Sequence, residues 1–131
     1  MANKKGINIL VVDDSPGTLE IIKRNLETKN YTVHTSTNVE EGINILSISN
    51  IDIVIKDLKM PGASGFELVR YVRENFRDIR VIMITGYPSI SDAVTAIKKG
   101  ADEFISKPFT GDELLKAVEK SIHKLKVSNL S

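Results

Sequence analysis

The sequence contains no cysteine and no tryptophan, and it has only two histidines among 131 residues. The lack of cysteine excludes disulfide bonds, thiolate metal sites and cysteine nucleophiles. With only His34 and His123, a zinc or iron centre built from several histidines is not expected. No apolar run is long enough to span a membrane, and Met1–Gly6 lacks the apolar stretch of a signal peptide. We therefore expect a cytoplasmic protein.

An excess of charge of either sign is also missing. Eighteen lysines and arginines face seventeen acidic residues, so no bulk electrostatic preference for DNA or an anionic membrane is expected. Hydrophobic residues make up 41% of the chain and charged residues 27%, which excludes a disordered chain. The length suits one domain, which we place at residues 7–125. Residues 1–6 are then an N-terminal tail, and 126–131 a tail or the start of a linker.

Short apolar runs alternate with longer amphipathic stretches along the chain. Three of the runs are almost entirely apolar, which suits strands that are buried on both faces of a parallel sheet. Two further runs are shorter or more polar. In chain order, the five expected strands are Ile7–Val12, Tyr31–Thr35, Ile51–Ile55, Arg80–Ile84 and Glu103–Ile105.

Helix signals lie between these runs. Ser15 followed by Pro16 is typical of a helix start, and Asn38 with Glu41 three residues later resembles a capping box. The expected helices run from Pro16 to about Thr28, Asn38 to about Ser47, Ser64 to about Phe76, Ser89 or Ser91 to Gly100, and from about Gly111 onward. Regular alternation of strands and helices predicts an α/β fold, with a parallel sheet and helices on both faces.

The apolar positions of the fourth of these helices are Ile90, Ala93, Val94 and Ile97. Gly100 then has the chemistry of a residue that ends a helix.

Polar residues follow the expected strands. Asp13 and Asp14 follow the first strand, Asp57 the third, Thr85 the fourth and Lys107 the fifth. In open α/β sheets, ligands bind beyond the carboxyl ends of the strands. In a sheet with strand order 2-1-3-4-5, four of these strand ends are neighbours, so the side chains would converge.

Three carboxylates in one crevice repel each other and need a cation or a proton. A site made only of oxygen ligands suits Mg²⁺ or Mn²⁺. A divalent ion beside a lysine and a hydroxyl is a good receptor for a phosphoryl group. The remaining carboxylate is then a candidate nucleophile that accepts the phosphoryl group as an acyl phosphate.

Four segments, at residues 11–14, 52–62, 84–86 and 100–109, resemble the receiver domains of response regulators. Each segment alone is a weak signal, but their order and spacing together are specific. The resemblance covers about residues 7–124 and assigns the chain to the CheY-like superfamily of two-component signal transduction. It implies a three-layer, doubly wound (βα)₅ fold of the flavodoxin-like type, with a five-stranded parallel sheet in the order 2-1-3-4-5.

The same resemblance implies roles for single residues. Asp57 matches the aspartate that is phosphorylated by a sensor histidine kinase or a phosphotransfer protein. Asp13, Asp14 and Asp57, with the backbone carbonyl of Lys59, match the ligands of Mg²⁺. Lys107 matches the lysine that contacts the phosphoryl oxygens.

Further implied roles concern switching. The Lys107–Pro108 peptide bond matches one that is typically cis. Thr85 matches the switch hydroxyl and Phe104 the aromatic switch, which together change the face formed by the fourth helix, the fifth strand and the fifth helix. That face would control a downstream effector or a covalently linked output domain, including one that regulates transcription, and would allow a homodimer. The domain would be a regulator, not an enzyme, because it catalyses only its own phosphoryl transfer and slow dephosphorylation. It would bind neither nucleic acid nor membrane directly.

One residue departs from the common pattern of the family, and two others stand at positions that tune its chemistry. Lys56 precedes Asp57 in a strand that should be buried, so its ammonium group must snorkel to water or pair with an acid. Lys59 and Tyr87 stand at positions that modulate the lifetime of the acyl phosphate in the family. A bulky Tyr87 would restrict the attacking water and lengthen that lifetime.

Several alternatives remain beside this interpretation. Residues 85–89 and 107–109 also resemble receivers of enhancer-binding transcription activators, so the chain is either a stand-alone regulator or a receiver from a multidomain protein. An aspartate-nucleophile phosphatase needs Asp-x-Asp after the first strand, where this chain has Asp13-Asp14-Ser15. A nucleotide- or flavin-binding protein needs a loop rich in glycine or hydroxyls there. A phosphorylation-independent scaffold is disfavoured because the set of key residues is complete.

Overall fold

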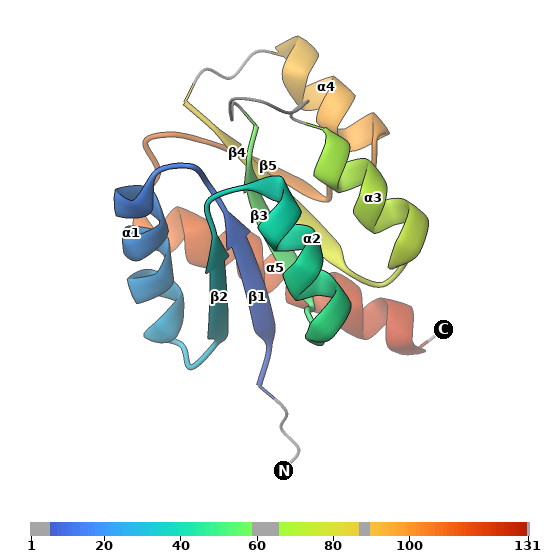
Figure 1. Ribbon diagram of the computed structural model, residues 1–131, viewed down its shortest axis with the longest axis horizontal. Coiled ribbons are helices and arrows are strands. Elements are labelled where there is room, and N and C mark those ends of the chain that lie inside the picture. Colours follow the sequence, from blue (N-terminus) through green and yellow to red (C-terminus); the bar gives the residue numbers. More distant parts are fainter. Residues whose placement is uncertain (1–5, 59–65, 87–89, 131) are drawn as a thin grey trace.

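The computed structural model describes residues 6–58, 66–86 and 90–130. Its sheet has five parallel strands in the order β2-β1-β3-β4-β5 (Figure 1). This confirms the predicted fold class and strand order. The strands are β1 (Asn8–Val12), β2 (Thr32–Ser36), β3 (Ile53–Asp57), β4 (Arg80–Thr85) and β5 (Glu103–Ser106).

Helices cover both faces of the sheet. They are α1 (Pro16–Glu27), α2 (Val39–Ile48), α3 (Glu67–Asn75), α4 (Ile90–Lys98) and α5 (Gly111–Leu130). Helices α1 and α5 pack on one face, while α2, α3 and α4 pack on the other. Figure 1 shows α2 in front of the sheet and α5 behind it. None of the helices in the described part of the chain is long and apolar enough to cross a membrane.

Strand alternation explains why the central strands are apolar throughout. In β1, Ile9 and Val11 pack against the α1 and α5 layer, whereas Leu10 and Val12 pack against the opposite layer. All four side chains are fully buried. Removal of each such side chain from water contributes about 1.5–3 kcal/mol, which favours a strand with helices on both sides.

The predicted helix boundaries agree with the structure at three points. Ser15 Oγ accepts a hydrogen bond from the Thr18 N–H at 3.3 Å, and Asn38 Oδ1 accepts one from the Glu41 N–H at 2.8 Å. Gly100 has a φ of 117°, in the left-handed region that a glycine enters without steric cost.

Two elements extend further than the sequence predicted. Strand β3 includes Lys56 and Asp57, although the sequence predicted its end at Ile55. Helix α5 continues to Leu130, so residues 126–130, expected as a tail or the start of a linker, are helical, because nothing between Ser121 and Leu130 is glycine or proline. The predicted start of the third helix at Ser64 lies outside the described residues.

Two of the apolar positions of α4 are exposed to water. Val94 and Ile97 are 47% and 51% exposed, whereas Ala96 is fully buried. The helix packs against the core through this small residue, and the larger side chains of Val94 and Ile97 remain partly in water. Nothing local in the sequence distinguishes the two faces, because alanine and isoleucine both count as apolar.

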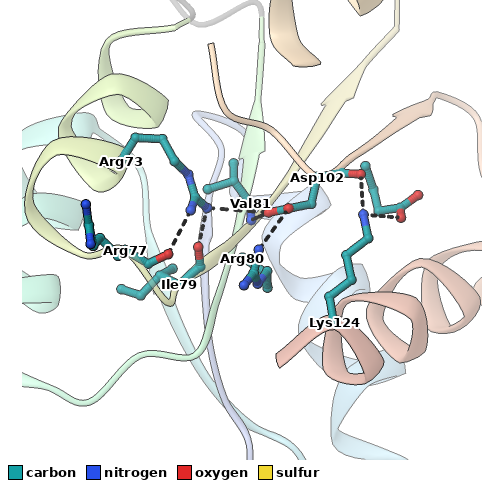
Figure 2. A network of polar contacts seen from close by, with 8 residues as sticks. Arg73, Arg77, Ile79, Arg80, Val81, Asp102 and Lys124 are labelled. Carbon is teal, nitrogen blue, oxygen red and sulfur yellow. Dashed lines mark hydrogen bonds and ion pairs between the residues drawn. The ribbon is translucent and has the colours of Figure 1, made fainter. Parts of the chain in front are cut away.

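The amino ends of β4 and β5 are joined by a charged cluster that the sequence analysis did not anticipate (Figure 2). Asp102, just before β5, accepts a hydrogen bond from the Val81 N–H at 2.9 Å. Its carboxylate also lies 3.4 Å from the Arg73 guanidinium and 3.3 Å from that of Arg80. One carboxylate thus ties α3 to β4. We call the group the Asp102 cluster, and its charged members are Arg73, Arg80, Asp102, Glu103 and Lys124.

Further bonds extend this cluster to the neighbouring elements. Arg73 donates to the carbonyl oxygens of Arg77 and Ile79, which fixes the connection between α3 and β4. Lys124, from α5, donates to the Asp102 carbonyl oxygen at 3.1 Å and lies 3.4 Å from the Glu103 carboxylate. Burial lowers the pKa of Arg73, and Asp102 opposes this shift. The cluster therefore connects four elements at the amino edge of the sheet.

Candidate functional site

The carboxyl edge of the sheet gathers acidic side chains from two strand ends. Asp13 and Asp14 follow β1, and Asp57 is the last residue of β3. Because β1 and β3 are neighbours in the sheet, one carboxylate oxygen from each of the three residues lies within 4.8 Å of the others. Asp13 and Asp57 are buried, whereas Asp14 is exposed. We call these three residues the acidic site.

Asp13 is held from two directions. Its Oδ1 accepts a hydrogen bond from the Ser15 N–H at 2.9 Å, and its Oδ2 accepts one from Lys107 Nζ at 3.2 Å. The first bond links the carboxylate to the start of α1, where free N–H groups favour negative charge. The second links β1 to the end of β5. The side chain of Asp13 is only 2% exposed, so its orientation is well defined.

Lys107 bridges two of the carboxylates. Its Nζ lies 3.2 Å from Asp13 Oδ2 and 3.5 Å from Asp57 Oδ2. Its backbone N–H donates to the Thr85 carbonyl oxygen at 2.7 Å, which extends the pairing of β4 and β5. The Lys107–Pro108 peptide bond is cis. The structure thus brings together four residues that are far apart in the sequence, Asp13, Asp14, Asp57 and Lys107.

The acidic site fits a hard divalent cation. Its donors are carboxylate oxygens, and their mutual distances allow one small ion to contact all three residues. Mg²⁺ would retain several waters in such a site, for which the exposed Asp14 leaves room. The carbonyl of Lys59, expected as a further ligand, lies outside the described residues.

The two expected switch residues lie on neighbouring strands. Thr85, at the end of β4, is fully buried, and Phe104 in β5 is half-buried and packs against the core under α2, α3 and α4. Phe104 is opposite Met83 in the ladder, and strand alternation places Thr85 on the same face as Met83. Tyr87, expected to affect the lifetime of an acyl phosphate, lies outside the described residues.

Lys56 does not reach water. It is 1% exposed, and its Nζ donates a hydrogen bond to the main-chain carbonyl oxygen of Asp57. Burial lowers the pKa of Lys56, while the charges of Asp57, Asp13 and Asp14 raise it again. Of the two expected outcomes, snorkelling to water is therefore excluded, and the neighbouring acids act on the lysine through their charge.

An open hollow adjoins Asp57, and the sequence analysis had not singled out the residues of α1 that form its wall. Thr18 and Ile21 line it from α1, opposite Gly86 and Phe109. Ile21 is 58% exposed although its neighbour Ile22 is fully buried. Two consecutive isoleucines cannot both face the core from one helix, so this pair was a signal that one of them faces another surface.

Comparisons with known proteins agree with this geometry. Residues 9–119 match the family model described as the response regulator receiver domain. The heme response regulator HssR of Staphylococcus epidermidis is 34% identical over 93% of this chain and 54% of its own length. The probable transcriptional regulator ycf27 of Cyanidium caldarium is 32% identical over 97% of this chain and 51% of its own.

A solved structure shows the same architecture. The CheY-like response regulator receiver domain protein from Methanospirillum hungatei superimposes with a TM-score of 0.89 at 27% identity, covering 95% of this chain and 99% of that one. The chain spans about half the length of the curated relatives it matches. Family match, relatives and fold all agree, and the chain belongs to the response regulator receiver domains of two-component signalling.

Proposed function

We propose that this chain is a phosphorylation-controlled switch in which Asp57 accepts a phosphoryl group from a phosphohistidine of a sensor kinase or phosphotransfer protein. The observation that carries the proposal is the position of the Asp57 carboxylate. It lies beside two further carboxylates and 3.5 Å from the ammonium group of Lys107, at the wall of an open hollow. A protein-bound phosphohistidine needs such an opening to reach a nucleophile that is only 7% exposed.

The carboxylates and the lysine of this site are the residue types that phosphoryl transfer to Asp57 requires. A carboxylate oxygen of Asp57 forms a bond to phosphorus while the bond from phosphorus to the histidine nitrogen breaks, and the imidazole keeps that electron pair. Lys107 would move from the carboxylates to the phosphoryl oxygens and neutralise part of their charge. Asp13, Asp14 and Asp57 would hold Mg²⁺ or Mn²⁺, which supplies positive charge next to the phosphoryl oxygens when it is bound.

The output follows from the position of the switch residues. A new charge at Asp57 would bias Thr85 and Phe104, which share the face of the sheet under α4. Helix α4 carries Val94 and Ile97 exposed to solvent, and such apolar side chains suit contact with an effector, a linked output domain or a second copy of the chain. Because relatives are named as transcriptional and heme response regulators, we propose that the output controls transcription.

Intact mass spectrometry tests the proposal directly. The chain is incubated with acetyl phosphate or phosphoramidate, with and without Mg²⁺, and compared with the variant Asp57→Asn. We expect a labile gain of one phosphoryl group in the wild type that requires Mg²⁺ and is absent from the variant. Asp78→Asn is a matched control, because Asp78 is an exposed acid far from the strand ends that form the site.

Two results would count against the proposal. An adduct of equal yield in Asp57→Asn would place the phosphoryl group on another residue. No adduct in the wild type with either donor, at any Mg²⁺ concentration, would instead support a scaffold that works without phosphorylation.

A further inference from the structure

Lys56 places a cation inside the protein, directly behind the acidic site. The side chain is 1% exposed and has apolar partners on both sides in the sheet, Val12 in β1 and Met83 in β4. Its Nζ is bonded to the main-chain oxygen of Asp57, the residue whose side chain carries the chemistry. A buried ammonium group is costly unless nearby acids compensate for the lost hydration. Its position next to three carboxylates supplies that compensation.

The two lysines near the site differ in their freedom to move. Lys107 has a side chain that is 26% exposed and contacts Asp13 and Asp57 directly, so it can turn toward an incoming anion. Lys56 is enclosed and bonded to the main chain. The position of its nitrogen is therefore fixed whatever binds at the carboxylates.

A positive charge at this position changes the net charge of the acidic site and its surroundings. The charges of the three carboxylates act on Lys56 as well as on Lys107, so the group as a whole carries one net negative charge, where Lys107 alone would leave two. A divalent cation that enters must approach a site already partly neutralised. Repulsion between the ammonium group and the ion is screened little by water, because Lys56 is enclosed by protein.

We propose that Lys56 is a positioning residue that acts as a permanent internal counter-ion of the acidic site and lowers its affinity for Mg²⁺. It thereby sets the Mg²⁺ concentration at which Asp57 becomes competent for phosphorylation. The inference rests on the proposed function, since it concerns the same site and the same ion.

Isothermal titration of the metal-free chain with MgCl₂ measures this effect without any phosphoryl transfer. The neutral variants Lys56→Met and Lys56→Gln retain most of the volume of the side chain and remove its charge. We expect both to bind Mg²⁺ on the order of tenfold more tightly than the wild type. Lys99→Met is the matched control, because Lys99 is an exposed lysine near the amino edge of the sheet, and its Kd should equal that of the wild type.

The direction of the change separates an electrostatic role from a structural one. Damage to the fold around β3 would weaken Mg²⁺ binding, whereas removal of a repelling charge strengthens it. Circular dichroism of each variant confirms the fold before titration, and two different neutral residues guard against a local packing defect in either. The Mg²⁺ concentration for half-maximal labelling by phosphoramidate should fall by a similar factor in the variants.

The outcomes distinguish the inference from the function on which it rests. Unchanged or weaker Mg²⁺ binding in both variants would overturn the role of Lys56, while Mg²⁺-dependent labelling of the wild type would still support the proposed function. A wild-type chain that neither binds Mg²⁺ nor becomes labelled would overturn both.

Discussion

The two edges of the sheet each carry a cluster of five charged residues, and the two clusters have opposite net charges. At the amino edge, the Asp102 cluster has three cations and two anions. At the carboxyl edge, the acidic site has three anions, whose charges act on the cations Lys107 and Lys56. Both clusters join several elements through long-range contacts, but their internal bonding differs.

In the Asp102 cluster, the central carboxylate is surrounded by donors. It accepts from a main-chain N–H and lies near two guanidinium groups, so it offsets the repulsion between the charges of Arg73 and Arg80. In the acidic site, like charges lie within 4.8 Å of one another. The difference indicates that the first cluster stabilises the fold, whereas the second holds repulsion that a bound cation can relieve.

The largest expected effect comes from removing the centre of the Asp102 cluster. Asp102→Ala leaves the Arg73 and Arg80 guanidinium groups and the Val81 N–H without their shared acceptor. We expect the free energy of unfolding to fall by about 3 kcal/mol, measured by urea denaturation without Mg²⁺.

Asp78→Ala is the control for this variant, because Asp78 is an exposed acid near the same edge. Its effect should stay within about 0.5 kcal/mol. A loss below about 1 kcal/mol in Asp102→Ala would mean that the cluster contributes little to the fold.

A smaller loss is expected where the backbone approaches this cluster. A Cβ at Gly100 would lie 2.3 Å from Arg73 Cγ, and the residue has a φ of 117°. Gly100→Ala should therefore lower the free energy of unfolding by about 2 kcal/mol, because it combines backbone strain with displacement of Arg73.

The comparison variant for this test is Gly17→Ala. A Cβ at Gly17 would have Ser15 Oγ as its nearest neighbour, at 3.9 Å, and the position is helical. We expect a change of zero to about 0.5 kcal/mol in the stabilising direction. If both glycine variants behaved alike, Arg73 would not be held in place as the contacts indicate.

The smallest effect has the opposite sign and concerns the acidic site. Asp57→Asn removes one of three like charges, so in the presence of a metal chelator it should raise the free energy of unfolding by about 1 kcal/mol. Urea denaturation measures the gain, and Asp78→Asn should show none. A decrease in Asp57→Asn would contradict the view that this edge holds net repulsion between its carboxylates.

The sequence predicted the acidic site better than the Asp102 cluster, for a physical reason. Asp13, Asp57 and Lys107 each follow a recognisable strand, and the carboxyl ends of parallel strands meet at one edge. The partners of Asp102 lie in α3 and at the start of β4, and no periodicity relates them. Pairing between side chains of separate elements leaves no local pattern.

The sequence also predicted some buried residues better than others. Apolar runs identified the central strands, but they could not show that α4 buries Ala96 and leaves Ile97 half exposed, since a hydrophobic pattern accepts both residues equally. The sequence also marked Lys56 as unusual in a buried strand. It could not show that the main-chain oxygen of Asp57 receives its ammonium group, because that contact depends on the path of the side chain.

Consecutive residues at the end of β3 face opposite layers of the protein. Asp57 lines the hollow beside α1, whereas Lys56 follows Val54 on the side covered by α2, α3 and α4. Only the backbone of β3 separates the two layers at this point. The negatively charged Asp57 lies on one side of it and the positively charged Lys56 on the other. A change of charge on the α1 side therefore acts on the opposite layer through space, even before any backbone atom moves.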